Sequence, residues 1–157
     1  MEQILIRTVS LNDANDIQKH CFVRNTLEEV EKRISENIEN NEFVIQYVAE
    51  VDGHAVGTMK LVKENHPLYA HRCGLGDVVV GGEYQGKGIA RKIFEKCVDY
   101  CKNNAVKIII VSVRGGEPAE KVYNKLGFIE YGRLKAGIIE PWNDNKEYDE
   151  VFLCYRV

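Results

Sequence analysis

The sequence lacks the signatures of membrane and nucleic-acid-binding proteins. Its longest uninterrupted apolar runs are only a few residues, far short of the roughly 20 that a membrane-spanning helix needs. Residues 1–3 do not resemble the start of a signal peptide. The formal net charge is -3, whereas a protein that reads a phosphate backbone needs a basic face. We therefore expect a cytoplasmic protein with no membrane and no nucleic-acid partner.

A paired set of cysteines is also missing. The chain has five cysteines, an odd number, and no C-x-x-C pair, which favours reduced thiols over a disulfide framework. Cys97 and Cys101 are four residues apart and can share a helix face, so a metal site is one interpretation. No histidine lies near them in the sequence, and small apolar core residues are the better interpretation. We expect no metal.

The composition is that of an ordinary globular protein. Of 157 residues, 45% are apolar and 29% are charged, with no sign of disorder or of a compositional repeat. A chain of this length can bury about two thirds of the surface that it exposes when unfolded. The sequence predicts one domain over residues 1–157.

The first half of the chain reads as a strand, two helices and a hairpin, and the first helix runs from a cap at Asn12 or Asp13 towards Cys21. Residues 4–9 form a short apolar strand pattern, and residues 27–40 repeat apolar side chains at helical spacing after a capping signal. Apolar residues then alternate over 43–51 and return over 55–62, around the turn signal Asp52-Gly53. These two arms predict antiparallel strands.

The second half begins with a strand, helix and strand. Residues 75–80 predict a strand, and apolar residues recur every three or four positions from Gly88 to Cys101. The β-branched run at 107–113 is typical of a central strand that is covered on both faces. This order predicts one parallel crossover unit.

The chain ends with a short helix and two strands. Pro118 suits the first turn of a helix that Gly127 stops. Strands are expected over 128–134 and 148–157, with an irregular segment between them. Trp142 lies in that segment, where it either lines a pocket, forms a dimer contact or packs down on the sheet.

Glycines stand where the helix after residue 80 should begin. Gly86 and Gly88 have no Cβ atoms, so phosphate oxygens can approach the free amides at the helix start. A P-loop is one interpretation, but Gly88 replaces its Ser or Thr and no Walker-B strand is evident. A dinucleotide G-x-G-x-x-G is also absent, because Arg91 stands at its last glycine.

Two motifs carry a family resemblance. Gln85-x-x-Gly88-x-Ala90 resembles the coenzyme-A pyrophosphate loop of the GNAT N-acetyltransferase superfamily, and PAEKVYNKLGF, residues 118–128, resembles its second signature. The order of elements agrees over essentially the whole chain. The resemblance implies an α/β (α+β) GNAT fold: a central mixed, mostly antiparallel sheet of six or seven strands, splayed at the cofactor site, with about four helices on its faces.

The chain departs from the family pattern at two places. Many members place a proline before the loop, where this chain has Gly81-Gly82, and this change is expected to loosen the loop. Many members also carry an asparagine where this chain has Gly116, which is expected to remove a cofactor or substrate contact.

The resemblance implies acetyl-CoA as cosubstrate and assigns residues to it. The main chain of the preceding strand would pair with the pantetheine arm and direct one N–H at the thioester oxygen, the loop amides would hold the pyrophosphate, and Lys87 and Arg91 would add positive charge. The cosubstrate-binding residues are thus Val78, Val79, Val80, Gln85, Gly86, Lys87, Gly88, Ile89, Ala90, Arg91 and Tyr123.

Chemical roles fall to a tyrosine and a carboxylate. By resemblance Tyr123 protonates the departing thiolate, and by helix periodicity alone it would be a core tyrosine. The general base is open among Asp77, Glu83 and His71, acting directly or through water.

The implied reaction is acetyl transfer to a primary amine, expected to belong to a small molecule, by direct attack in a ternary complex. A coenzyme-A-binding sensor without chemistry, a peptide or protein N-acetyltransferase and a P-loop-like phosphate binder are the alternatives. The family also implies that homodimers can form.

Overall fold

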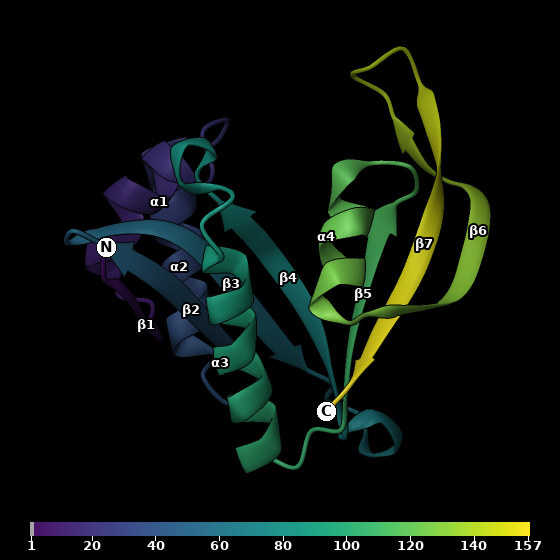
Figure 1. Cartoon of the computed structure of the whole chain (residues 1–157), viewed down its shortest axis with the longest axis horizontal. Helices are drawn as coiled ribbons and strands as arrows, with labels where there is room; N and C mark the ends of the chain where they lie inside the picture. Colours follow the sequence, from purple (N-terminus) through teal and green to yellow (C-terminus); the bar gives the residue numbers. More distant parts are fainter. Residues whose placement is uncertain (1) are drawn as a thin grey trace.

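One mixed sheet organises the computed structural model, which describes residues 2–157 (Figure 1). Its seven strands run in the order β1-β2-β3-β4-β5-β7-β6, and every neighbouring pair is antiparallel except β4 and β5. The strands are β1 Ile4–Thr8, β2 Val44–Val51, β3 His54–Lys63, β4 Arg72–Val80, β5 Ile108–Arg114, β6 Ile129–Glu140 and β7 Lys146–Arg156. The predicted mixed, mostly antiparallel sheet is confirmed.

Four α-helices cover the sheet. They are α1 Ala14–His20, α2 Leu27–Glu39, α3 Ile89–Asn103 and α4 Pro118–Leu126. A large apolar cluster joins α3 and α4 to one face, and a smaller cluster joins α1 and α2 to the other face of β2 and β3. Cys97 and Cys101 are fully buried in the larger cluster, as expected of small core residues.

The helix ends follow their local signals. Thr26 caps α2 in a capping box with Glu29, and each side chain satisfies a backbone N–H that the helix start leaves free. Pro118 is the first residue of α4, and Gly127 ends it with φ +106°. A left-handed residue at this position is typical of glycine.

The sheet splays in its middle. β4 and β5 pair only from Arg72–Gly74 to Ile108–Ile110, and beyond these three pairs the strands diverge (Figure 1). A β-bulge lies just past the divergence, because Thr58 pairs with Val79 and Lys60 with Gly76. Asp77 and Val78 therefore stand opposite one residue of β3, and the bulge bends the end of β4.

The predicted irregular segment at 135–146 is wrong. β6 continues to Glu140 and β7 begins at Lys146, so the two strands form one long hairpin. The pairing is interrupted only by register shifts, one of them between Leu134 and Ile138, where Ala136 takes φ +51°. The bulge at Ala136, followed by Gly137, and the Pro and Asn residues of the hairpin tip interrupt the alternating pattern, which is why the sequence alone looks irregular here.

One further expectation fails at this end of the sheet, and one of the three interpretations of Trp142 is excluded. β5 is not covered on both faces, since Ile109 is fully buried while Ser112 is exposed. The reason is that α1 and α2 pack on β2 and β3 and do not reach that side of β5. Trp142 is 78% exposed at the tip of the β6–β7 hairpin, so it does not pack down on the sheet.

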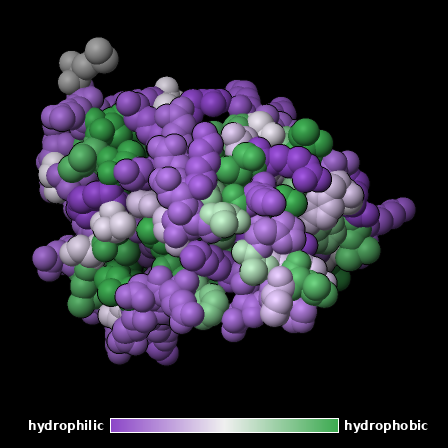
Figure 2. Space-filling model, turned by 90° about the horizontal axis from the view of Figure 1, so that it is seen from below, coloured by the Kyte–Doolittle hydropathy of each residue, from purple (hydrophilic) through white to green (hydrophobic). Residues whose placement is uncertain are grey.

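The surface shows small apolar groups among polar ones. On the face drawn in Figure 2, hydrophobic side chains are scattered in separate groups between hydrophilic residues, as is usual for protein surfaces. Within residues 2–157, every helix is too short or too polar to cross a lipid bilayer.

Candidate functional site

A cleft opens where the end of β4 meets the starts of α3 and α4. It has a volume of about 520 Å³. The lining residues are Val78, Val79, Val80, Gln85, Gly86, Gly88, Ile89, Ala90, Pro118, Ala119, Val122, Tyr123 and Lys125. The splay of the sheet and the glycine loop thus contribute to the same hollow.

The loop before α3 presents unshielded amides to this cleft. Gly86 and Gly88 both have φ +78°, and a Cβ built on either would meet no atom of residues 2–157 within 4 Å. Gly88 is the N-cap of α3 and supplies no side-chain cap. The first amides of a 15-residue helix are therefore free to bind an anion, with the positive end of the helix dipole behind them.

The exposed edge of β4 supplies a second set of donors and acceptors. From Leu75 onward β4 has no β5 partner in the described chain, and residues 78–80 of this unpaired stretch line the cleft. Unpaired strand edges bind extended ligands through main-chain hydrogen bonds. The cleft therefore suits a ligand with an extended amide-bearing arm and a phosphate group.

Tyr123 stands at the wall of the cleft. Its side chain is 7% exposed and packs edge-on against Phe128, with ring centroids 5.4 Å apart. Burial raises the pKa of Tyr123 to about 12, so the phenol stays protonated at neutral pH. The hydroxyl forms no hydrogen bond with residues 2–157 and is available to a ligand.

The structure brings most of the predicted cosubstrate residues together in the cleft, with the exception of Lys87 and Arg91. Lys87 Nζ lies 3.0 Å from Glu2 Oε2. Arg91 lies between α3 and α4 and donates a 2.8 Å hydrogen bond to the carbonyl of Lys125. Neither cation lines the cleft, and their predicted contribution to phosphate binding stays a prediction.

The three candidate bases lie outside the cleft lining. Asp77 points to Lys60 and Arg33. Glu83 lines a neighbouring hollow of about 430 Å³. His71 precedes β4, so seven residues at about 3.3 Å each separate it from Val78, roughly 23 Å.

Sequence reasoning missed part of the α4 wall. Pro118, Ala119, Val122 and Lys125 all line the cleft, and from Ala119 on they recur every three residues. The spacing of an α-helix, with about 3.6 residues per turn, places these side chains on one face of α4.

The two departures from the family pattern have local consequences. Gly81 donates to the carbonyl of Val56 at 2.8 Å and accepts from the amide of Tyr84 at 2.8 Å, which anchors the residue before the loop. Gly116 has φ +81°, and its amide donates to Glu120 Oε2 at 2.8 Å. Without a side chain it offers only its main chain to a ligand.

Known proteins share this fold and parts of this sequence. The model of the "Acetyltransferase (GNAT) family" matches residues 11–128. Spermidine N(1)-acetyltransferase of Escherichia coli (strain K12) is 34% identical over 91 residues, which are 57% of this chain and 47% of that protein. The match thus spans about half of the Escherichia coli protein. Spermidine N(1)-acetyltransferase of Vibrio cholerae is 26% identical over 150 residues, covering 93% of this chain and 83% of that protein.

A solved structure extends the likeness to the whole fold. The phosphinothricin acetyltransferase of Sinorhizobium meliloti, solved in complex with AcCoA, superposes with a TM-score of 0.81 at 18% identity, over 98% of this chain and 88% of that one. Identity at that level shows the fold alone. The family model, however, matches well over half of the chain, including the glycine loop and the Tyr123 helix, and the chain therefore belongs to the GNAT family of acetyltransferases.

Proposed function

We propose that this protein is an acetyl-CoA-dependent N-acetyltransferase that acts on a primary amine. The observation that carries the proposal is the meeting of two features in one cleft: the uncapped glycine loop at the start of α3 and the unpaired edge of β4. The loop fits a pyrophosphate, and the strand edge fits a pantetheine arm with its two amides.

Each part of the cleft has a distinct task. The amides from Gln85 to Ala90 bind the pyrophosphate, and the main chain of residues 78–80 aligns the pantetheine arm and directs an N–H at the thioester oxygen. Acetyl-CoA supplies an acetyl group activated as a thioester and leaves as the free thiol. The acceptor amine attacks directly while both substrates are bound, so the protein holds the two reactants in contact.

Tyr123 acts on the departing sulfur. Its pKa of about 12 lies about 3.5 units above that of an ordinary thiol near 8.5. Full proton transfer to a free thiolate would therefore be uphill by about 5 kcal/mol. We infer that Tyr123 donates a hydrogen bond to the sulfur as negative charge develops there, and that solvent completes the protonation.

The amine must lose its proton before it attacks. Glu83 is the candidate base that lies next to the cosubstrate loop, in the hollow that it shares with His20 and His54. Replacing Glu83 with Gln should remove the acidic limb of the pH–rate profile if Glu83 serves this role, directly or through water.

A small polyamine is the first acceptor to test. Two relatives are named spermidine N(1)-acetyltransferases, and the net charge of -3 favours the approach of a cation. A peptide or protein amine is the alternative acceptor.

Two assays test the function. Calorimetric titration should give micromolar binding of acetyl-CoA and no heat with ATP–Mg²⁺. Thiol release should then depend on spermidine and stay at background with a peptide carrying a free N-terminus. Binding without thiol release from any amine would identify a sensor module instead, and ATP binding alone would refute the proposal.

We also infer a homodimer and a cytoplasmic location. Large apolar side chains are exposed along the edge strand β6, which ends the sheet: Ile129, Tyr131, Leu134 and Ile139. An exposed apolar edge of this length is typical of a protein–protein contact. All five cysteines are free thiols, which suits a reducing compartment. Light scattering on the purified chain should give twice the mass of 17.9 kDa.

A further inference from the structure

A layer of polar side chains lies between α2 and the sheet, beneath the bulge in β4. Asp77 Oδ2 lies 3.1 Å from Lys60 Nζ on β3, and Asp77 Oδ1 lies 3.8 Å from Arg33 on α2. The side chains of Asp77 and Lys60 are only 19% and 22% exposed. One half-buried carboxylate therefore joins three elements by charge.

A second network continues this layer. Asn37 on α2 donates to Gln46 on β2 at 2.9 Å, and Gln46 donates to Thr58 on β3 at 3.0 Å. Thr58 pairs with Val79 across the sheet. The residues on both sides of the bulge are thus tied to α2.

Asp77 itself occupies the strained position of the bulge. It has φ +49°, a left-handed conformation that side chains other than those of Asp and Asn rarely adopt. A residue in such a conformation persists when its surroundings hold it there. Here the surroundings are Lys60 and Arg33, and the next three residues are the cleft-lining segment Val78–Val80.

We propose that Asp77 is a positioning residue: through Lys60 and Arg33 it fixes the β4 bulge and thereby aims the main chain of Val78–Val80 into the cleft. This inference rests on the proposed function. It also gives Asp77 a role other than that of the base, because its carboxylate is held between two cations.

The charges explain why a carboxylate is needed at this place. Without Asp77, Lys60 and Arg33 would be two like charges facing each other in a half-buried layer. Without Lys60, the carboxylate would keep only the longer contact to Arg33. Either loss frees the bulge to relax toward regular pairing, which would turn the amides of β4 away from the cleft.

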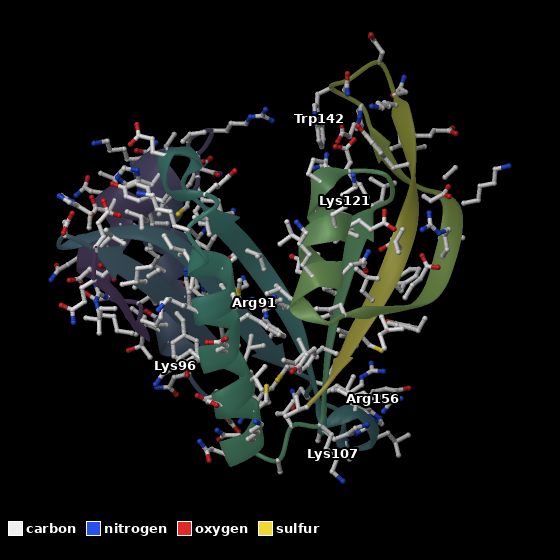
Figure 3. The ribbon with its side chains drawn as sticks, viewed as in Figure 1. Arg91, Lys96, Lys107, Lys121, Trp142 and Arg156 are labelled. Atoms are coloured by element: carbon white, nitrogen blue, oxygen red, sulfur yellow. The ribbon has the colours of Figure 1, made fainter. Side chains whose placement is uncertain are left out.

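The test compares Asp77→Asn, Lys60→Met and the double variant. Asn tolerates the left-handed conformation, so Asp77→Asn removes the charge and leaves the backbone preference in place. Lys96→Met is the matched control, because Lys96 lies on α3 and points away from α4 and the cleft in Figure 3. Each protein is titrated with acetyl-CoA and with adenosine 3′-phosphate 5′-diphosphate, the half of the molecule that lacks the pantetheine arm.

We expect each single variant to weaken acetyl-CoA binding about tenfold, and the double variant to be no weaker than the worse single, because the two residues act as one pair. Binding of adenosine 3′-phosphate 5′-diphosphate should stay within twofold of the unmodified protein, since the glycine loop is untouched. The Lys96→Met control should bind both ligands normally, and both limbs of the pH–rate profile should survive in every variant.

Three results would overturn the inference. One is unchanged acetyl-CoA affinity in both single variants. Another is additive losses in the double variant. The third is a catalytic-base pattern, in which Asp77→Asn abolishes the acidic limb of the pH–rate profile and Lys60→Met does not.

Failure of the unmodified protein to bind acetyl-CoA would instead refute the proposed function, and with it this inference. If Asp77→Asn does not fold by circular dichroism, Arg33→Met replaces it, because that variant keeps the Asp77 side chain and removes its contact with α2.

Discussion

A single added methyl group tests the glycine loop. In the Gly86→Ala variant the new Cβ meets no protein atom within 4 Å among residues 2–157, so the only penalty to the free protein is its φ of +78°. A left-handed L residue costs about 1–2 kcal/mol. For a chain of this size that corresponds to a loss of about 2–8 °C in Tm. The bound state loses more, because the methyl group occupies the space through which a phosphate must approach the amides.

The extra loss follows from one hydrogen bond. A hydrogen bond to a charged group contributes about 1.5–3 kcal/mol, so losing one weakens acetyl-CoA binding about tenfold to hundredfold. Gly53→Ala is the matched control: Gly53 has φ +81° and equally open surroundings, but it lies in the β2–β3 turn outside the cleft. Both variants should lose similar stability in a thermal melt, and only Gly86→Ala should lose affinity by calorimetry. Equal affinity in the two variants would mean that phosphate does not bind at this loop.

Three other substitutions test the rest of the site and the fold. Tyr123→Phe should lower kcat about tenfold to hundredfold with little change in the KM for acetyl-CoA, measured by thiol release; unchanged turnover would remove Tyr123 from the chemistry. Arg7→Met should cost about 2 kcal/mol in urea unfolding at pH 7, because it leaves the buried Asp13 carboxylate without its 2.7 Å partner. Burial alone would raise the pKa of Asp13, but hydrogen bonds from Arg7 and Ser10 hold it below its usual value. This stability is therefore present at neutral pH and is lost as pH falls through the pKa of Asp13, so the gap between wild type and variant should shrink by pH 3. Gly127→Ala should destabilise the chain and leave acetyl-CoA affinity unchanged, since its Cβ would lie 3.2 Å from the Tyr155 ring at φ +106°; a normal melting temperature would contradict this packing.

The elements that the sequence predicts best are those with signals at both ends. Residues 118–126 match α4 to the residue, because Pro118 fixes the first turn and Gly127 takes the left-handed conformation that stops it. The hairpin of β2 and β3 likewise follows from Asp52-Gly53, both of which have positive φ. At these positions the local sequence determines the backbone conformation.

The predictions that failed concern positions whose conformation or exposure depends on residues far away in the sequence. Ala136 takes a left-handed φ because of the way β6 pairs with β7. No local sequence pattern predicts that register. The partial exposure of β5 depends on how far α1 and α2 extend over the sheet. The setting of Asp77 depends on Arg33, 44 positions earlier on another element, and no local sequence pattern predicts that contact.

The three-pair ladder between β4 and β5 gives this sheet two interior edges in addition to its outer ones. An unpaired edge is a template on which a strand of another chain can form, and proteins normally shield it. Under the proposed function the cosubstrate shields the β4 edge, because a pantetheine arm bound along β4 would take up the same hydrogen-bonding groups that a foreign strand would use. Acetyl-CoA would thus guard the chain against intermolecular β-association, and cells or buffers depleted of it would hold the protein in its most aggregation-prone form.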